Sequence, residues 1–285
     1  MTKEIRITKH QANSIGCFFG FCHWGFFSHS SLGFRHCLAV LTLSLLVVES
    51  ACAKVLIVAD EFPAMEVVAA KLKSEEQIES SLVSQKDLPS SLADYQAVIV
   101  YIHGPLFEQS ESAFIAYTKA GGKLMLLHHS ISSGKRKNTN WFPFLGVSLP
   151  AGDLAHGGYK WIEGVGFDLL NLQPDHFIMT NKVVYPEKLS LTNFAGISGQ
   201  RAFPGFRLEH TEVYLNHVHT EPRTLLMGLR YLDSASRINY THDLAGWMKP
   251  AGKGHVIYFM PGHTKADFEN PVYGRIIVNA VIYKP

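Results

Sequence analysis

The chain has 285 residues, of which 47% are hydrophobic and 18% charged, and its formal net charge at pH 7 is +2. These values are typical of an ordinary globular protein with enough apolar residues for one large core or two small ones. Basic and acidic residues balance beyond residue 53 and no basic run occurs there, so nucleic-acid binding is not expected.

The first 53 residues have the pattern of an export signal. Arg35 precedes the apolar run CLAVLTLSLLVV, and Ala51 and Ala53 form a small-x-small cleavage site before Lys54. The run is about a dozen residues long, which is too short to span a bilayer comfortably. We therefore expect a signal peptide over 1–53 and a mature domain that is periplasmic or secreted, with no stable membrane span after signal removal. A membrane anchor left uncleaved is the alternative.

All four cysteines lie in the same N-terminal stretch: Cys17, Cys22, Cys37 and Cys52. From Lys54 to Pro285 the sequence contains none. This excludes a disulfide framework, a cysteine-based zinc site and a cysteine nucleophile in the mature domain.

The first half of the mature chain alternates between strands and helices. Short apolar runs predict strands, and apolar residues at helical spacing predict helices. In chain order we expect a strand over 54–60, a helix over 64–77, a weak strand over 78–85, a strand over 97–104, a helix over 110–122 and a strand over 123–128. This order is typical of βαβ units, and it predicts an α/β fold with a doubly wound, mostly parallel sheet.

The second half is less regular. The segment from about Asp153 to Arg207 mixes glycine, proline and aromatic residues and gives few helix signals. Around it we expect a short helix over 141–146, strands over 211–219, 224–233 and 254–263, and a closing helix over 271–285. Neither an internal repeat nor a low-complexity linker divides the sequence, so a single domain over 54–285 is the simplest interpretation.

Polar residues follow several of the predicted strands at their carboxyl ends, where parallel sheets place their ligands. These residues are Asp60 and Glu61, His103, the group His128, His129 and Ser130, and His263. We expect them to converge on one cleft. Alternation along a strand would turn His129 to the opposite face, which favours a structural role for it. Asp60 and Glu61 have a second interpretation as caps of the following helix.

Two segments resemble those of ThuA-like (trehalose utilisation) proteins. GGKLMLLHHS is similar to the family's strand-plus-histidine motif, and AGKGHVIYFMPGHTKADFENPVYGRIIVNAVIY is similar to its closing signature. EVY at 212–214 falls where the family has an acid and an aromatic residue, and WFPFLGV with the following histidine, Trp141 to His156, resembles the segment after the histidine elbow. The resemblance implies the class I glutamine amidotransferase-like fold, which is flavodoxin-like.

The resemblance also bears on the type of reaction. Glutamine amidotransferases carry a cysteine at the elbow and a histidine after a later strand. Here His128 occupies the elbow and His263 matches the later histidine, so amidotransferase chemistry is not expected. The family is associated with the use of trehalose and related disaccharides through oxidised (keto) sugar intermediates.

Three hypotheses follow for the function. The first is an exported carbohydrate-active enzyme, in which His128 and His263 transfer protons and Glu212 orients one of them. The second is a metal-dependent sugar hydrolase or isomerase, with a divalent metal held by His128, His156, Glu212 and His263. The third is a non-catalytic sugar-binding protein on the same fold. In each, the expected substrate-binding residues are His103, Ser130, His156, Trp161 and Tyr214, and Trp141 is a further candidate for stacking on a sugar ring.

His217 and His219 fall on one face of the strand predicted over 211–219. Such a spacing suits a metal ion, but it is equally common in solvated strands. The sequence leaves these two readings open.

Overall fold

The computed structural model describes residues 54–285; the export signal predicted over 1–53 lies outside the described residues. Its main feature is a ten-stranded sheet with the order β2-β1-β3-β4-β12-β11-β10-β6-β8-β7. The strands of this sheet are β1 (Lys54–Ala59), β2 (Glu79–Val83), β3 (Tyr95–Tyr101), β4 (Lys123–Leu127), β6 (Lys160–Asn171), β7 (Glu187–Phe194), β8 (Ile197–Leu215), β10 (Thr224–Leu232), β11 (Asn239–Ala251) and β12 (Gly254–Phe259). Two short strands, β5 (Val147–Ser148) and β9 (Val218–His219), form a separate antiparallel pair.

The strands β2, β1, β3, β4 and β12 run parallel and form one half of the sheet. The strands β1, β3, β4 and β12 are largely continuous apolar runs because both of their faces are covered, whereas the edge strand β2, ESSLV, is only partly buried. Residues Val55 to Ala59 of β1, for example, are fully buried. The predicted α/β fold is confirmed, and the strands expected over the first half of the domain lie where the sequence places them.

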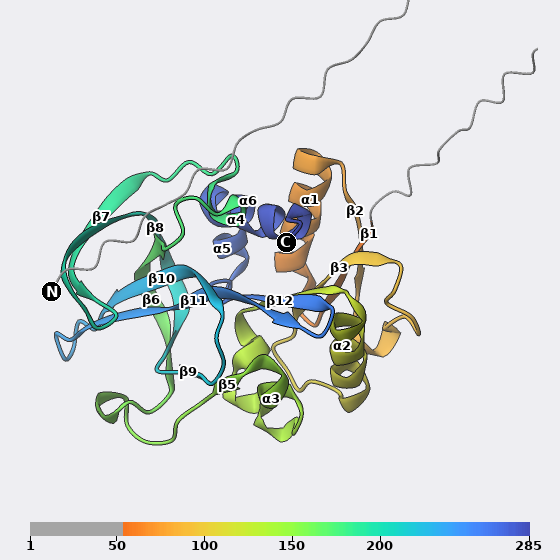
Figure 1. The fold of residues 1–285 in the computed structure, drawn as a ribbon, viewed down its shortest axis with the longest axis horizontal. Helices are drawn as coiled ribbons and strands as arrows, with labels where there is room; N and C mark the ends of the chain where they lie inside the picture. Colours follow the sequence, from red (N-terminus) through yellow and green to blue (C-terminus); the bar gives the residue numbers. More distant parts are fainter. Residues whose placement is uncertain (1–53) are drawn as a thin grey trace, which may run out of the picture. The chain divides into compact units, whose positions relative to one another are not determined.

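Helices cover both faces of the sheet (Figure 1). One face carries α1 (Phe62–Glu76), α4 (Phe177–Thr180), α5 (Lys265–Glu269) and α6 (Pro271–Ile282), and the other carries α2 (Glu108–Ala120) and α3 (Trp141–Leu145). The closing helix α6 is buried along nearly its whole length, as its apolar sequence predicts. Gly121, with φ of 125°, ends α2 and lets the chain turn directly into β4.

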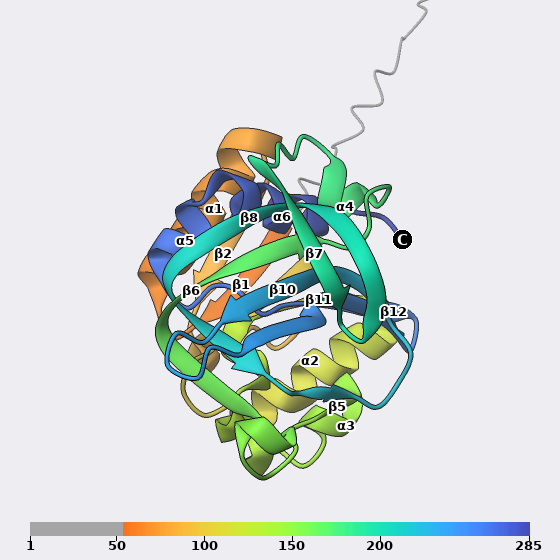
Figure 2. The same cartoon turned by 90° about the vertical axis from the view of Figure 1, so that its left-hand side faces the viewer.

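The other half of the sheet is antiparallel and strongly curved, as Figure 2 shows for β7 and β8. It includes the segment 153–207, which the sequence left irregular and which forms β6, β7 and the start of β8. The alternation of apolar and polar residues in this segment is obscured because the pairing of β6 with β8 shifts register on both sides of Val165, which lies between two glycines. The sheet is therefore mixed, with a parallel half and an antiparallel half.

The strand predicted over 211–219 is interrupted. β8 ends at Leu215, Asn216 takes a left-handed conformation with φ of 60°, and β9 begins only at Val218. As a result, His217 and His219 do not lie on one face of a continuous strand.

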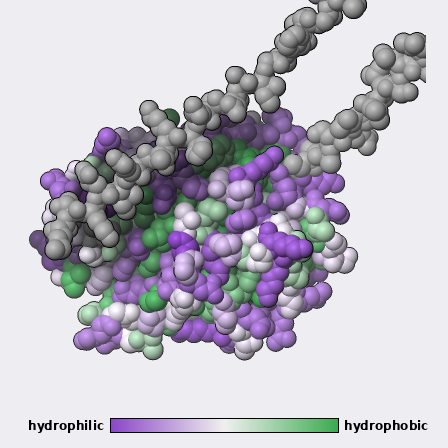
Figure 3. All heavy atoms as spheres, viewed as in Figure 1, coloured by the Kyte–Doolittle hydropathy of each residue, from purple (hydrophilic) through white to green (hydrophobic). Residues whose placement is uncertain are grey.

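The helices of residues 54–285 include none that is long and apolar enough to cross a membrane. On the face shown in Figure 3, hydrophilic and hydrophobic residues are interspersed. 

Candidate active site

The site begins where β4 ends. A 3₁₀ turn, η2 (His128–Ile131), follows Leu127 directly, and His128 has a left-handed φ of 41°. That conformation is unfavourable for a residue with a Cβ atom and costs about 1–3 kcal/mol, so the surrounding contacts must hold it in place. Because the strand geometry stops here, the alternation of side chains stops too. His129 therefore points to the same site as His128, and the prediction that it faces the other side of the sheet is wrong.

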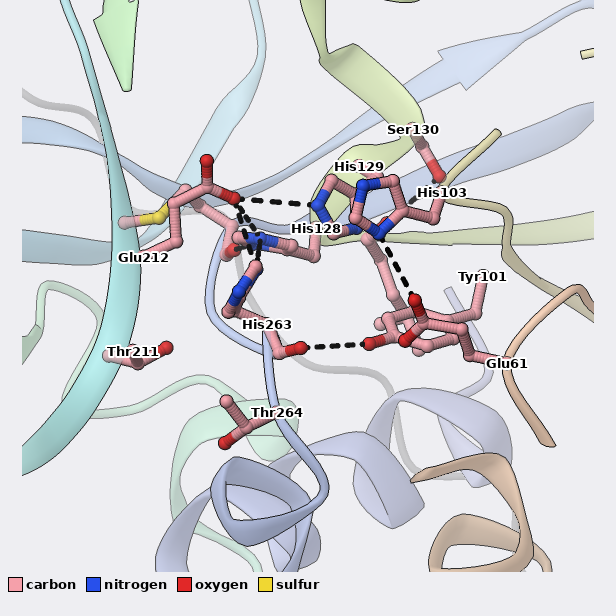
Figure 4. A network of polar contacts seen from close by, with 12 residues as sticks. Glu61, Tyr101, His103, His128, His129, Ser130, Thr211, Glu212, His263 and Thr264 are labelled. Carbon is pink, nitrogen blue, oxygen red and sulfur yellow. Dashed lines mark hydrogen bonds and ion pairs between the residues drawn. The ribbon is translucent and has the colours of Figure 1, made fainter. Parts of the chain in front are cut away.

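Three imidazoles meet around one carboxylate oxygen (Figure 4). Oε2 of Glu212, from β8, lies 2.7 Å from Nε2 of His128, 3.4 Å from Nε2 of His129 and 3.2 Å from Nδ1 of His263. One nitrogen or oxygen of each residue lies within 4.8 Å of those of the others. We call His128, His129, Glu212 and His263 the histidine–glutamate cluster.

A hydrogen bond to a backbone carbonyl sets the tautomer of His128. Nδ1 of His128 lies 2.5 Å from the carbonyl oxygen of Met260. A carbonyl can only accept, so Nδ1 carries a hydrogen and donates it. In the neutral ring, Nε2 then has a lone pair that faces the carboxylate of Glu212. At 2.7 Å, such a contact is stable when a proton lies between the two atoms, and a metal ion bound by both would hold them further apart, at about 3.3 Å.

The charge states of two cluster members follow from their surroundings. Burial lowers the pKa of His129 to about 3, more than the neighbouring carboxylate raises it, so this imidazole is neutral at physiological pH. Burial raises the pKa of Glu212, but the polar contacts with His128 and His129 outweigh this effect and hold the pKa well below its usual range. The cluster is thus a buried carboxylate that faces imidazole nitrogens.

Asp267 connects the segments that carry Glu212 and His263. Its Oδ2 accepts a hydrogen bond of 2.6 Å from the hydroxyl of Thr211, next to Glu212, and one of 3.1 Å from the backbone N–H of Thr264, next to His263. The second bond is part of the capping box of α5. The aspartate is 1% exposed, and the sequence reasoning did not single it out. The pattern Thr264-x-x-Asp267 is the signal that could have revealed its capping role.

His103 follows the end of β3 and packs against the cluster. Its ring stacks on His129 with the centroids 3.8 Å apart, and its Nδ1 lies 3.1 Å from Oε1 of Glu61. Asp60 accepts hydrogen bonds of 2.7 Å from the backbone N–H groups of His103 and Gly104. The expected capping role of Asp60 and Glu61 is wrong, because neither side chain bonds to the first turn of α1. Both hold the loop after β3 instead.

The buried ammonium of Lys135 holds the same loop from the other side. Its Nζ donates to the carbonyl oxygens of Ile102, His103 and Gly104 at 2.9, 3.0 and 2.6 Å. Burial lowers its pKa to about 8. Sequence reasoning missed this residue because a lysine in a polar run such as SSGKRKNTN is typical of a solvated loop.

A pocket of about 210 Å³ opens onto the cluster. His103, His129 and Glu212 line it together with the aromatic residues Tyr159, Trp161 and Tyr214. Trp161 is 49% exposed, while Tyr214 is buried and lies flat against His128, with the centroids 4.8 Å apart. The structure therefore brings His103, His128, Trp161, Glu212, Tyr214 and His263 to one place, as the sequence predicts.

Three predicted residues are placed differently. His156 is exposed at the end of the turn η4 (Leu154–His156) and belongs neither to the pocket nor to the cluster, so His129 takes its place in the predicted metal set. The Ser130 hydroxyl is buried and donates to the carbonyl oxygens of Leu127 and Val100. Trp141 is fully buried and donates its N–H to the Ser130 carbonyl, so the expectation of an exposed stacking ring is wrong.

The fold and the site together define an α/β protein with a buried histidine–carboxylate centre at the carboxyl ends of its parallel strands. The family model described as ThuA, trehalose utilisation, matches residues 53–284, and the chain belongs to this family.

Two of the similar solved structures share this fold at low sequence identity. A ThuA-like protein from Bacteroides uniformis is 15% identical with a TM-score of 0.53, and the match covers 81% of this chain and 92% of that one. A cytoplasmic protein from Salmonella typhimurium is 14% identical with a TM-score of 0.53, covering 80% and 98%. A glutamine amidotransferase from Thermotoga maritima is 10% identical with a TM-score of 0.46, covering 81% and 99%. Among curated proteins, none matched.

Proposed function

We propose that this protein is a carbohydrate-active enzyme that acts on a disaccharide or keto-sugar at the histidine–glutamate cluster. The observation that carries the proposal is a buried carboxylate, that of Glu212, faced by three imidazoles at the end of a pocket with aromatic walls. The family's description, trehalose utilisation, supports the class of substrate. Glutamine amidotransferase chemistry is not part of the proposal, since the chain has no cysteine from residue 54 onward.

Three of the distances in the cluster fit a divalent metal cation, while the 2.7 Å contact between His128 and Glu212 is shorter than the distance between two ligands of one ion. Nitrogen and oxygen ligands lie about 2.0–2.2 Å from Zn²⁺ in tetrahedral sites, which places neighbouring ligand atoms about 3.3 Å apart. The separation between Nε2 of His128 and Nδ1 of His263 is 3.3 Å, and those from Glu212 to His263 and His129 are 3.2 and 3.4 Å. The set of imidazoles and one carboxylate suits a first-row transition metal.

The bound cation would polarise a substrate carbonyl or lower the pKa of a water molecule. The protein's own residues have separate tasks in this proposal. The carbonyl of Met260 orients His128 through its Nδ1–H, as backbone carbonyls commonly orient metal-binding histidines. His103 and Trp161 at the pocket mouth bind the substrate, His103 through a hydroxyl group and Trp161 through stacking.

Proton transfer without a metal is the second candidate. Its support is the 2.7 Å contact between His128 and Glu212, because a charge-assisted hydrogen bond has this length when the imidazole is protonated. In that case His128 and His263 are the acid–base pair, and effective catalysis of this kind contributes about 10²–10⁴ in rate.

A pair of histidine variants tests the function. We expect His263→Ala to lose at least about 100-fold in turnover of trehalose or its keto derivatives. The matched control, His156→Ala, removes an exposed histidine outside the cluster and should leave turnover unchanged. A purified protein that binds these sugars without converting them would show a non-catalytic binding protein, and equal turnover in both variants would contradict the proposed site.

We further propose that the chain is exported and that its mature form begins at Lys54. The support is the apolar run before the small-x-small motif at residues 51–53. N-terminal sequencing of protein from the periplasm or the medium should start at Lys54. Full-length protein confined to the cytoplasm would contradict export.

A further inference from the structure

Two cross-strand pairs form part of the wall of the pocket that opens onto the histidine–glutamate cluster. Glu163 on β6 pairs with Glu212 on β8, and Trp161 pairs with Tyr214 two positions away. Side chains two residues apart on a strand point to the same face, and all four of these residues line the pocket. The pocket therefore contains a second carboxylate, that of Glu163, which is not part of the cluster.

Glu163 is placed where it does not help folding. The Cβ atoms of a cross-strand pair lie about 4.5–5.5 Å apart, and two like charges in such a pair are destabilising. Glu163 is exposed, and within residues 54–285 no hydrogen bond or ion pair engages its side chain.

The backbone changes direction immediately after Glu163. The register of β6 against β8 shifts between Glu163 and Val165, and Gly164 has a left-handed φ of 70°. Irregularities of this kind are frequent next to active sites, where they direct a side chain. The local structure of β6 thus presents a carboxylate without a partner to the pocket.

The other lining residues indicate the charge of the ligand. They include Glu212 and two serines, Ser132 and Ser133, but the described residues of the lining include neither a lysine nor an arginine. Proteins usually bind phosphate and carboxylate groups through arginine or lysine. Hydroxyl groups, in contrast, can donate hydrogen bonds to a carboxylate, and such charge-assisted bonds are stronger than neutral ones. The lining therefore suits a neutral ligand with several hydroxyl groups.

The size of the pocket suits one sugar ring. Its volume of about 210 Å³ is smaller than the roughly 300–1,000 Å³ of pockets for drug-sized ligands. Residues two positions apart on a strand are separated by about 6.8 Å, which is the spacing of Trp161 and Glu163 along β6. A sugar ring that stacks on Trp161 therefore has hydroxyl groups within reach of the Glu163 carboxylate.

We propose that Glu163 is the specificity-determining residue of this pocket. Its carboxylate accepts hydrogen bonds from hydroxyl groups of the sugar ring that stacks on Trp161, and its negative charge excludes anionic sugars. The proposal rests on the proposed carbohydrate function. It gives the two acids of the pocket separate tasks, because Glu212 belongs to the cluster whereas Glu163 contacts the substrate.

The test compares a neutral sugar ring with the corresponding sugar acid. Binding of trehalose, glucose and glucuronate to the purified protein is measured by calorimetry for the wild type and for Glu163→Gln, which removes the charge and keeps the shape of the side chain. Glu187→Gln is the matched control, because Glu187 is an exposed glutamate on β7 of the same sheet and does not line the pocket. Both substitutions are at exposed positions and should leave the melting temperature unchanged.

We expect the wild type to bind glucose at least about tenfold more tightly than glucuronate. Glu163→Gln should bind glucose and trehalose about five- to tenfold more weakly, because a charge-assisted hydrogen bond becomes a neutral one. Its preference for glucose over glucuronate should narrow by about tenfold, because the repulsion between the two carboxylates is lost. The control variant should keep the wild-type values for all three ligands.

Three outcomes would overturn the role of Glu163 and leave the proposed function in place. They are unchanged binding in Glu163→Gln, equal weakening of all three ligands in that variant, and a wild type that binds glucuronate as tightly as glucose. Failure of the wild type to bind any of the three ligands would overturn the role of Glu163 together with the carbohydrate function.

Discussion

Replacing Glu212 by glutamine removes the negative charge at the centre of the cluster while keeping the shape of the side chain. Glu212 is 3% exposed and is the one acid among the four cluster residues. If the cluster holds a divalent cation, Glu212→Gln loses an anionic ligand and we expect the affinity for the cation to fall about 100- to 1,000-fold. This loss corresponds to about 2.7–4.1 kcal/mol.

The expected loss of affinity is large enough to be measured as a change in the melting temperature. A ligand present at about 1,000 times its dissociation constant stabilises the folded state by about 4 kcal/mol. For a domain of this size, each kcal/mol shifts the melting temperature by about 2–4 °C. Adding Zn²⁺ to the metal-free wild type should therefore raise its melting temperature by about 8–16 °C. The same addition should raise that of Glu212→Gln by about 6 °C or less, since a 100-fold loss of affinity leaves about 1.4 kcal/mol of stabilisation.

A matched control is provided by Glu163→Gln. Glu163 lines the same pocket and pairs with Glu212 across β6 and β8, but it is not part of the cluster. It should respond to Zn²⁺ as the wild type does. The reasoning is refuted if the wild type shows no shift, or if Glu212→Gln shows the full shift, since the carboxylate would then not bind the cation.

Three further outcomes are expected. Asp267→Asn should weaken cation binding about 10- to 100-fold in the same titration, because it loosens the link between the segments that carry Glu212 and His263. An unchanged affinity would show that Asp267 only caps α5. Lys135→Met should lower the free energy of unfolding, measured in urea, by about 2 kcal/mol, because three backbone carbonyls lose their donor. An unchanged free energy of unfolding would show that water takes the place of the ammonium group. Burial lowers the pKa of His217 to about 3, so its contribution to stability is complete above about pH 6.5 and is lost as the pH falls towards 3. Between pH 7 and 5.5, the free energy of unfolding of His217→Leu should therefore fall by about 1 kcal/mol less than that of the wild type.

The sequence predicted the parallel half of the fold well because four of its five strands, β1, β3, β4 and β12, are buried on both faces and are largely continuous apolar runs. The edge strand β2 is only partly buried, and its sequence signal is correspondingly weak. It predicted the antiparallel half poorly because glycines and register shifts hide the alternation in β6 and β8. The elbow at His128 shows a similar limit. The sequence could place two histidines after a strand, but the left-handed backbone that turns His129 into the site is set by tertiary contacts.

The candidate site was predictable where strand ends supplied its residues. His128 and His263 follow neighbouring parallel strands, β4 and β12, so the shared edge of the sheet brings them together. His156 lies in a glycine-rich turn, and nothing in its local sequence fixes where such a turn leads. Asp267 and Lys135 act through contacts with residues 56 and 31–33 positions away, which single-sequence patterns do not reveal.

The most direct test of the central claim is a parallel titration of metal binding and turnover. Zn²⁺ or Mn²⁺ is added to the metal-free wild type, and bound metal and conversion of trehalose or its keto derivatives are measured in the same samples. We predict that both rise together and saturate at about one ion per chain, and that both are lost in His128→Ala. Full turnover by protein without bound metal would contradict the cation and favour proton transfer by the histidines alone.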